Sequence, residues 1–597
     1  MRHHLIGVLT IAFLALAAHV SSSQSSAQTS FRAFLDEDWK YWMAQYPETA
    51  TLLGYPGHDD KWTDYSPQAI AAREAHLAGV LAKLKGMNRG SLAAADQLDY
   101  DLYLDIVSTA IDGLKFGYDA MPIKGVIPRD LRMPINQMEG LPQDVPRVFS
   151  AMPARTTAEY ERIITRLRTL PALVDQTIAL MRAGMTKGAT PPRITMRDVA
   201  AQVAGQVVAK PLDSPLLAAF MKFPATVPAG DRDRLTRAAV DAYEKETRPA
   251  FDRLRTFIAD TYLPACRDSV SASALPDGAA MYAHNVRWHV TTPATPKEIH
   301  AIGLAEVKRI RGEMDEVMKR AGFTGGYHKF KQFLRTDPRF YYTDAESLLT
   351  GYRDISKRAD PELARLFVVL PRNPYGVVKM ADAVAPSQTT AYYEPGSLAA
   401  GRPGNMHANT YKLDARPKWE MEALTLHEAV PGHHLQIALA QELEGLPAFR
   451  KNSSYTAFVE GWALYSESLG ETMGFYTDPY SKFGQLTYDM WRAVRLVVDT
   501  GLHSMRWTRQ QAIDFFAENA AKTLQDITVE VDRYIVWPGQ ALGYKMGQIK
   551  IQELRRGVEK RLGDKFDVRA FHDVILRQGA VPMDVLERHV EAWVAAQ

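Results

Sequence analysis

The chain has 597 residues, of which 46% are hydrophobic and 23% are charged, with 71 lysines and arginines against 69 aspartates and glutamates. This composition excludes an intrinsically disordered chain, and a formal net charge of +2 argues against a dedicated nucleic-acid binder. The single cysteine, Cys266, excludes an intramolecular disulfide and a cysteine-based metal cage. Any metal must therefore be held by histidine and carboxylate.

The first 27 residues have the pattern of a secretory signal peptide. A basic start at Arg2 precedes an apolar run over residues 5–18, and the small residues 25–27 would allow cleavage before Gln28. The run is shorter than the roughly 20 residues of a membrane-spanning helix, so an uncleaved membrane anchor is the less favoured alternative. No cysteine follows the run, so we do not expect a lipoprotein anchor. We expect a periplasmic or secreted protein without membrane association after cleavage.

Residues 28–597 predict one two-lobed, mainly helical unit. Apolar residues recur at helical spacing over residues 67–85, and residues 295–298 (TPKE) form a capping box with proline at the first helical position, which predicts a helix ending at Ala321. Residues 368–412 are rich in proline, glycine and β-prone pairs, which indicates a small strand-and-loop element. Helical patterns resume at Trp419 and continue to the end of the chain.

One segment, residues 426–434 with the sequence LHEAVPGHH, indicates metal chemistry. Zinc hydrolases place two histidine ligands four residues apart on one helix, with a glutamate base beside the first. Here the residue four after His427 is Pro431, and on a regular helix His433 would point away from His427. Proline followed by glycine breaks a helix, and if two residues bulge out, His433 takes the place of the second ligand. We therefore predict His433 as a ligand and His434 as a supporting or substrate-facing group.

A third ligand is expected on the next helix, which begins near residue 453 and reads YTAFVEGWALYSE. Glu460 lies among apolar neighbours, and a carboxylate in such surroundings needs a partner because burying an unpaired charge is costly. Glu467, two turns further along, is the alternative and is expected to be more exposed. A solvated helix glutamate without any ligand role is the competing interpretation of Glu460.

Five segments together resemble one known family. They are HEAVPGHHLQ, FVEGWALYSE, RYIVWPGQALGYKMG, TTPATPKEIHAIGLAEV and YPETATLLGYPGHDD, and they resemble the bacterial family catalogued as domain of unknown function 885. That family is similar to a distant branch of the gluzincin metallopeptidases, which are mainly helical and hold zinc with two histidines and a glutamate. The resemblance implies a metallopeptidase-like fold in which His427, His433 and Glu460 bind one Zn²⁺ and Glu428 is the general base. The pair Pro431-Gly432 departs from the gluzincin pattern, so the choice between His433 and His434 stays open.

Further residues are candidates for substrate chemistry. Tyr544 is our candidate to stabilise the oxyanion, because related metallopeptidases use a tyrosine well downstream of the metal helix. The runners-up for this role are Tyr534 and His503. Arg533 is favoured over Arg492 and Arg495 for binding a substrate carboxylate. In the strand-and-loop element beside the cleft, Tyr392, Tyr393 and Asn409 are expected to offer an edge for an extended peptide.

The favoured function is an exported zinc-dependent hydrolase that cleaves peptide or related amide bonds. Its expected partner is a peptide or small amide substrate, with no nucleic acid. A non-catalytic exported protein with a structural metal site is the alternative from another class. An esterase or non-peptide amidase on the same scaffold is a third interpretation.

Overall fold

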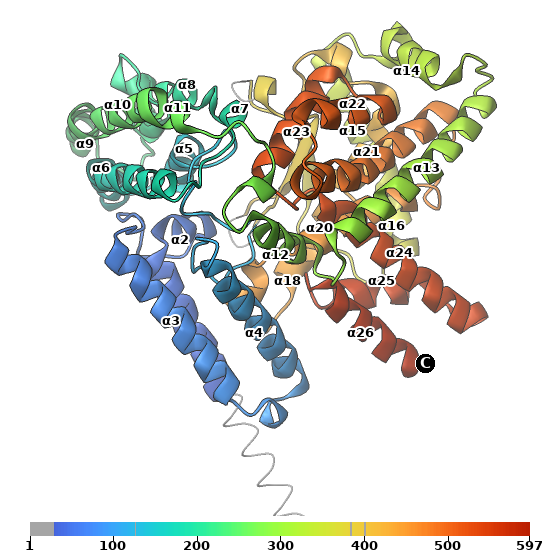
Figure 1. Cartoon of the computed structure of the whole chain (residues 1–597), viewed down its shortest axis with the longest axis horizontal. Coiled ribbons are helices and arrows are strands. Elements are labelled where there is room, and N and C mark those ends of the chain that lie inside the picture. Colours follow the sequence, from blue (N-terminus) through green and yellow to red (C-terminus); the bar gives the residue numbers. More distant parts are fainter. Residues whose placement is uncertain (1–28, 126, 383–384, 399–400) are drawn as a thin grey trace, which may run out of the picture. The chain divides into compact units, whose positions relative to one another are not determined.

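The computed structural model describes residues 29–125, 127–382, 385–398 and 401–597 (Figure 1), and the predicted signal peptide lies outside these residues. Within them, helices dominate and the strands form one small sheet, which confirms the predicted mainly α fold with a small β element. The chain divides into two compact units. The first comprises the chain up to Ile123, Pro128–Asp268 and Pro447–Asn452, and the second comprises Lys124–Ile127, Ser269–Leu446 and Ser453–Gln597.

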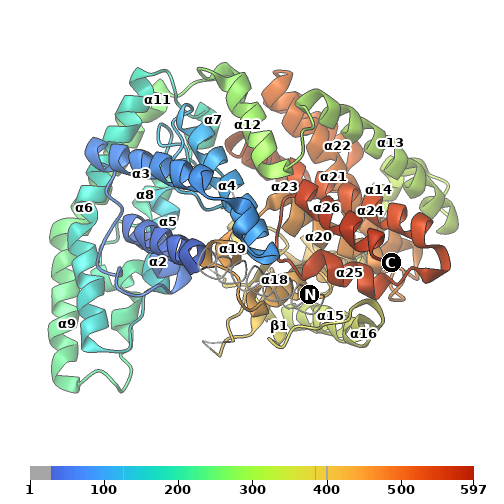
Figure 2. The same cartoon turned by 90° about the horizontal axis from the view of Figure 1, so that it is seen from below.

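The first unit is helical and contains its own hydrophobic core. Its longest helix, α6 (Thr157–Thr186), begins at a capping box formed by Thr156 and Glu159 and packs beside α9 (Ala229–Ala242), as Figure 2 shows. Cys266 is buried in this core. The other helices are residues 29–45, α2 (Pro47–Leu53), α3 (Pro67–Gly86), α4 (Ala94–Leu114), α5 (Leu141–Ala151), α7 (Arg193–Met196), α8 (Val199–Ala204), α10 (Arg248–Phe257), α11 (Leu263–Ala265) and α19 (Ala448–Asn452).

The second unit contains the predicted metal segment. Its helices are α12 (Gly278–Val290), α13 (Pro296–Arg320), α14 (Gly326–Thr336), α15 (Ala345–Ala359), α16 (Leu363–Leu366), α17 (Met421–Glu428), α18 (His433–Glu442), α20 (Thr456–Leu469), α21 (Pro479–Ser504), α22 (Arg509–Asn519), α23 (Leu524–Val536), α24 (Leu542–Leu562), α25 (Val568–Leu576) and α26 (Met583–Ala595). Thr295 and Glu298 form the predicted capping box of α13, and the helix ends one residue before Ala321.

Two close helix pairs build the centre of the second unit. Helices α13 and α21 run side by side (Figure 1) because Gly303 lets them approach: a Cβ on Gly303 would lie 2.7 Å from the Cβ of Leu496. Helices α20 and α24 meet in the same way at Gly461 and Gly547: an added Cβ would lie 2.6 Å from the backbone of Gly547 in the first case and 1.8 Å from the carbonyl oxygen of Ala457 in the second. Helix α20, which carries Glu460, is therefore held directly against α24.

The small sheet lies within the stretch for which the sequence predicts strands and loops. It has three strands in the order β1 (Tyr375–Lys379), β3 (Gly404–Ala408), β2 (Ala391–Glu394). Strand β3 pairs in parallel with β1 and antiparallel with β2, so β2 is an edge strand. Helix α17 contacts β2, which brings this edge next to the helix that ends at the HE pair of residues 427–428.

Candidate metal centre

The metal segment is two helices joined by a tight break. Helix α17 ends at Glu428, and α18 begins at His433. The Val430–Pro431 peptide bond is cis. At Gly432 an added Cβ would lie 1.9 Å from the carbonyl oxygen of His427, so a side chain is not tolerated there.

Helix α20 holds this break in position. The carbonyl oxygen of Pro431 accepts a hydrogen bond from Trp462 Nε1 at 2.9 Å and from Ser466 Oγ at 3.3 Å. Both donors are fully buried. These contacts fix the break against the helix that carries Glu460, and they set the direction of His433, the first residue of α18.

The break brings His433 to the side of His427. The Nε2 atoms of His433 and His427 lie 3.4 and 3.7 Å from Oε2 of Glu460, and ligand atoms of the three residues all fall within 4.8 Å of one another. With metal–ligand bonds of 2.0–2.1 Å, a tetrahedral zinc site separates its ligand atoms by about 3.3–3.4 Å. The three side chains therefore converge at the spacing of a zinc site.

Glu460 has a buried oxygen that suits a cation. Its Oε2 atom is buried and has no hydrogen-bond partner among the described residues. Burial acts to raise the pKa of Glu460, but the facing imidazoles of His433 and His427 outweigh it and hold the pKa well below its ordinary value. A buried carboxylate oxygen without a hydrogen bond, facing two imidazole nitrogens, is an arrangement that a divalent metal would satisfy.

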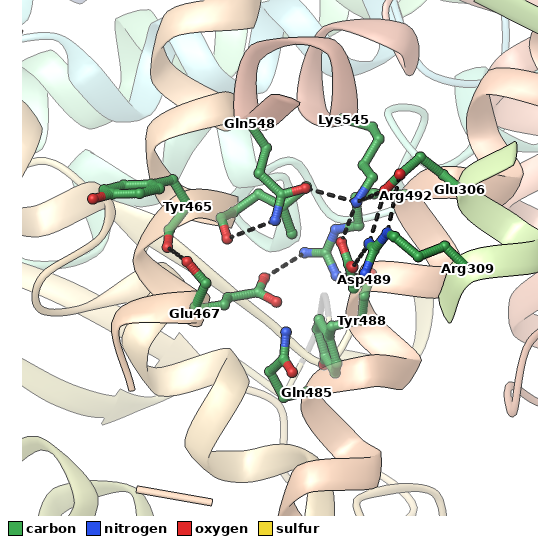
Figure 3. Close-up of polar contacts among 12 residues, drawn as sticks. Glu306, Arg309, Tyr465, Glu467, Gln485, Tyr488, Asp489, Arg492, Lys545 and Gln548 are labelled. Atoms are coloured by element: carbon green, nitrogen blue, oxygen red, sulfur yellow. Dashed lines mark hydrogen bonds and ion pairs between the residues drawn. The ribbon is translucent and has the colours of Figure 1, made fainter. Parts of the chain in front are cut away.

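A second carboxylate supports His427 from behind. Glu467 accepts a hydrogen bond from His427 Nδ1 at 2.8 Å, and a nitrogen of Arg492 lies 3.5 Å from the same oxygen (Figure 3). Such a carboxylate fixes the tautomer in which Nε2 is the ligand atom. The expectation that Glu467 is more exposed than Glu460 is wrong, because the Glu467 side chain is fully buried whereas that of Glu460 is 20% exposed.

Glu428 is the last residue of α17 and follows His427 directly. It is 8% exposed. Burial raises its pKa, while the neighbouring His427 and His433 act in the opposite direction. The structure therefore has a buried carboxylate immediately beside the convergent ligands, as the sequence predicts for the base.

His434 faces the sheet and not the ligand set. Its Nδ1 is hydrogen bonded to the Tyr393 hydroxyl at 2.9 Å, and its ring also bonds to the backbone of Asn373. Burial lowers the pKa of His434 to about 4, so the ring is neutral. His434 and Tyr393, both predicted to contact substrate, thus bind each other and connect α18 to β2.

Tyr544 and Arg533 form another contact pair. Arg533 donates a hydrogen bond to the Tyr544 hydroxyl at 3.1 Å. Tyr544 lies in the first turn of α24, next to Gly543, where an added Cβ would lie 2.7 Å from Thr456, one turn before Glu460. The tyrosine therefore belongs to the part of α24 that packs against the ligand-bearing helix.

His503 has a structural environment. The residue is fully buried, its Nδ1 accepts a hydrogen bond from the Ala272 amide at 3.0 Å, and its Nε2 donates to the Tyr534 carbonyl at 2.9 Å. Because both ring nitrogens are engaged by backbone groups, the geometry does not favour His503 as a catalytic residue.

Two functional features were not found from the sequence. One is the supporting role of Glu467, for which the signal was its spacing of seven residues from Glu460, on the same face of one helix. The other is the charge cluster of Arg495, Glu530 and Arg533 described below. Sequence spacing pairs Glu530 with Arg533, three residues apart on α23, but it does not indicate Arg495, which comes from α21.

The fold and the site define a class of mainly helical proteins with a convergent His-His-Glu set. The chain belongs to the family described as bacterial protein of unknown function (DUF885), whose model matches residues 47–590. The further likeness to gluzincin peptidases stays a prediction. No curated protein matches the chain.

Two solved structures are similar to the chain over nearly its whole length. One, from Colwellia psychrerythraea, is described as a putative lipoprotein; it is 29% identical, with a TM-score of 0.89, and the match covers 96% of this chain and 100% of the other. The second, from Shewanella oneidensis, is described as a putative lipoprotein of unknown function; it is 16% identical, with a TM-score of 0.71 and coverage of 94% and 98%. Among the described residues, no helix combines the length and apolar character needed to cross a bilayer.

Proposed function

We propose that the protein is an exported zinc-dependent hydrolase that cleaves peptide or related amide bonds. The observation that carries the proposal is the orphaned Oε2 of Glu460, which faces His427 and His433 with Glu428 beside them. Two imidazoles and one carboxylate are a donor set of catalytic zinc sites, which keep a fourth position open. A purely structural site would need the ligands but no adjacent carboxylate base.

The proposed reaction is hydrolysis by an activated water. Bound Zn²⁺ would supply a Lewis acid that polarises the substrate carbonyl and makes a water acidic enough to attack at neutral pH. Glu428 accepts the proton of the attacking water as the new C–O bond forms, and it then passes this proton to the leaving amine as the amide C–N bond breaks.

The edge strand β2 is proposed to bind the peptide backbone. Its outer side has no strand partner within the described sheet, and β2 contacts helix α17, which ends at the catalytic glutamate. An extended peptide can add to such an edge through main-chain hydrogen bonds. Export is supported by the N-terminal apolar segment and by the description of the Colwellia psychrerythraea relative as a putative lipoprotein.

Glu428→Gln tests the proposal. The variant should keep its zinc, measured by elemental analysis, and its rate of peptide hydrolysis should fall by about 10²- to 10⁴-fold. The substrate is a peptide library whose products are identified by mass spectrometry, with and without a chelator. Glu444→Gln changes an exposed glutamate just beyond α18 and should keep full activity. Undiminished hydrolysis by Glu428→Gln would refute the mechanism, and cleavage of esters alone would favour the esterase interpretation.

A further inference from the structure

The cluster of Arg495, Arg533 and Glu530 carries an excess positive charge inside the second unit. Arg495 binds Glu530 Oε2 at 2.9 Å, and Arg533 approaches Oε1 at 3.4 Å. Within the described part of the chain, Glu530 is the one carboxylate that contacts either guanidinium. Two positive charges therefore face one negative charge, and the side chains of Arg495 and Glu530 are both only 4% exposed.

Both carboxylate oxygens of Glu530 already have partners. Besides the two arginines, it accepts a hydrogen bond from the Tyr534 hydroxyl at 2.7 Å. Burial would raise its pKa, but Arg495 and Arg533 outweigh this effect and lower the pKa to about 2. Glu530 is thus ionised at any physiological pH, and the unbalanced charge belongs to the arginines.

Donor groups of the cluster also lack acceptors. One terminal nitrogen (Nη1) of Arg495 and Nε of Arg533 are buried without a hydrogen-bond partner among the described residues. Tyr544 lies between the arginines: its hydroxyl accepts from Arg533 at 3.1 Å, and its ring centroid is 4.3 Å from the Arg495 guanidinium carbon. Because its oxygen already accepts a hydrogen bond, the Tyr544 proton can be given to another acceptor. A buried, uncompensated charge with spare donors is costly unless an anion binds it.

The accessible side of this cluster belongs to Arg533, whose side chain is 16% exposed. The cluster is connected to the metal centre through two helices. On α21, Trp491 lies under the guanidinium groups of both Arg492 and Arg495, and Arg492 contacts the Glu467 that supports His427. On α24, the turn that carries Tyr544 packs against α20 beside Glu460.

We infer that Arg533 and Tyr544, backed by the charge of Arg495, bind the free C-terminal carboxylate of the substrate. Nη2 of Arg533 already donates to Gln540 at 2.8 Å and to Tyr544, so a carboxylate would be held by the remaining donor hydrogens of the guanidinium and by its charge. The inference rests on the proposed function and narrows it to substrates cleaved near a free carboxyl end. An aspartate or glutamate side chain has the same chemistry, so the test must separate the two sources.

Three peptides make this separation. All three are built on one N-acetylated sequence without acidic residues. The first ends in a free carboxylate and the second in an amide. The third also ends in an amide but has one glutamate added before it. Calorimetry with the zinc-loaded Glu428→Gln protein measures binding without turnover, and kcat/KM is measured with the wild type. We expect the free acid to bind about 10- to 100-fold more tightly than either amide, as for a charge-assisted hydrogen-bond pair.

Variants assign the effect to the cluster. Arg533→Gln should remove the preference for the free acid, and Tyr544→Phe, which deletes one hydroxyl, should reduce it. Arg509→Gln is the matched control, because Arg509 pairs with a carboxylate of its own, Asp532, and should keep the preference. Thermal unfolding checks that each variant is folded. If Arg533→Gln does not fold, Tyr544→Phe still tests the site.

The outcomes separate this inference from the proposed function. Equal binding of acid and amide, or a preference that survives in both Arg533→Gln and Tyr544→Phe, overturns the carboxylate site even if peptides are hydrolysed. Tight binding of the glutamate-containing amide overturns the C-terminal assignment in favour of a side-chain anchor. A strong preference for the acid without any hydrolysis by the wild type upholds the site and refutes the hydrolase.

Discussion

Glu467→Gln tests whether the buried carboxylate behind His427 supports metal binding. The hydrogen bond between His427 Nδ1 and Glu467 is 2.8 Å long and fully buried, so solvent does not replace it when the charge is removed. A hydrogen bond to a charged group contributes about 1.5–3 kcal/mol and a neutral one about 0.5–1.5 kcal/mol. The difference of about 1–1.5 kcal/mol predicts a zinc affinity about 5- to 13-fold lower in Glu467→Gln.

Glu467→Ala should have the larger effect. It removes the hydrogen bond entirely, and losses of this kind lower metal affinity by about 10- to 100-fold. It also leaves Arg492 without the carboxylate it faces, so the free energy of unfolding should decrease as well. Competition for zinc against a chromophoric chelator measures the affinities, with the exposed Glu471→Gln as the control. If both Glu467 variants bind zinc as tightly as the wild type, the supporting role is refuted.

Three further predictions concern the break, the ligand choice and pH. Gly432→Ala should lower the free energy of unfolding by several kcal/mol and reduce the zinc content, because the added Cβ would lie 1.9 Å from a backbone oxygen. The control Gly557→Ala has open space around it and should be neutral or slightly stabilising in thermal unfolding. His433→Ala should empty the metal site, and His434→Ala should retain zinc by elemental analysis; the reverse result would contradict the geometry. Burial raises the pKa of Asp499 to about 7 despite its hydrogen bonds, so between pH 4 and 7 the folded state binds more protons than the unfolded state and stability should fall as pH rises. Asp499→Asn should flatten this part of the profile in denaturant titrations, and an unchanged slope would refute it.

The sequence predicted much of the site because few residue types suit the chemistry. With one cysteine in the chain, metal ligands had to be histidine or carboxylate, and three histidines within eight residues narrowed the choice. His427, His433 and Glu460 do converge in the structure. The prediction of Glu467 was wrong in its exposure, because sequence spacing identifies the face of a helix but not which neighbours cover it.

The choice between His433 and His434 needed the tertiary structure. On a regular helix His433 would point away from His427. The break held by Trp462 and Ser466 turns His433 towards Glu460, while His434 turns to Tyr393. The role of His503 also needed the tertiary structure. A histidine is a plausible catalyst in a sequence, but here two backbone groups occupy its ring.

The sequence by itself determined the helical character, the capping box at Thr295, the strand-containing stretch and the identity of the donor set, because these depend on local periodicity and on the chemistry of single residues. The tertiary structure decided which donors meet, which carboxylate supports His427, and that Arg495 and Arg533 share the single carboxylate of Glu530. These features depend on contacts between helices far apart in the chain. Their energies come from burial and charge balance, which exist only after the helices have packed.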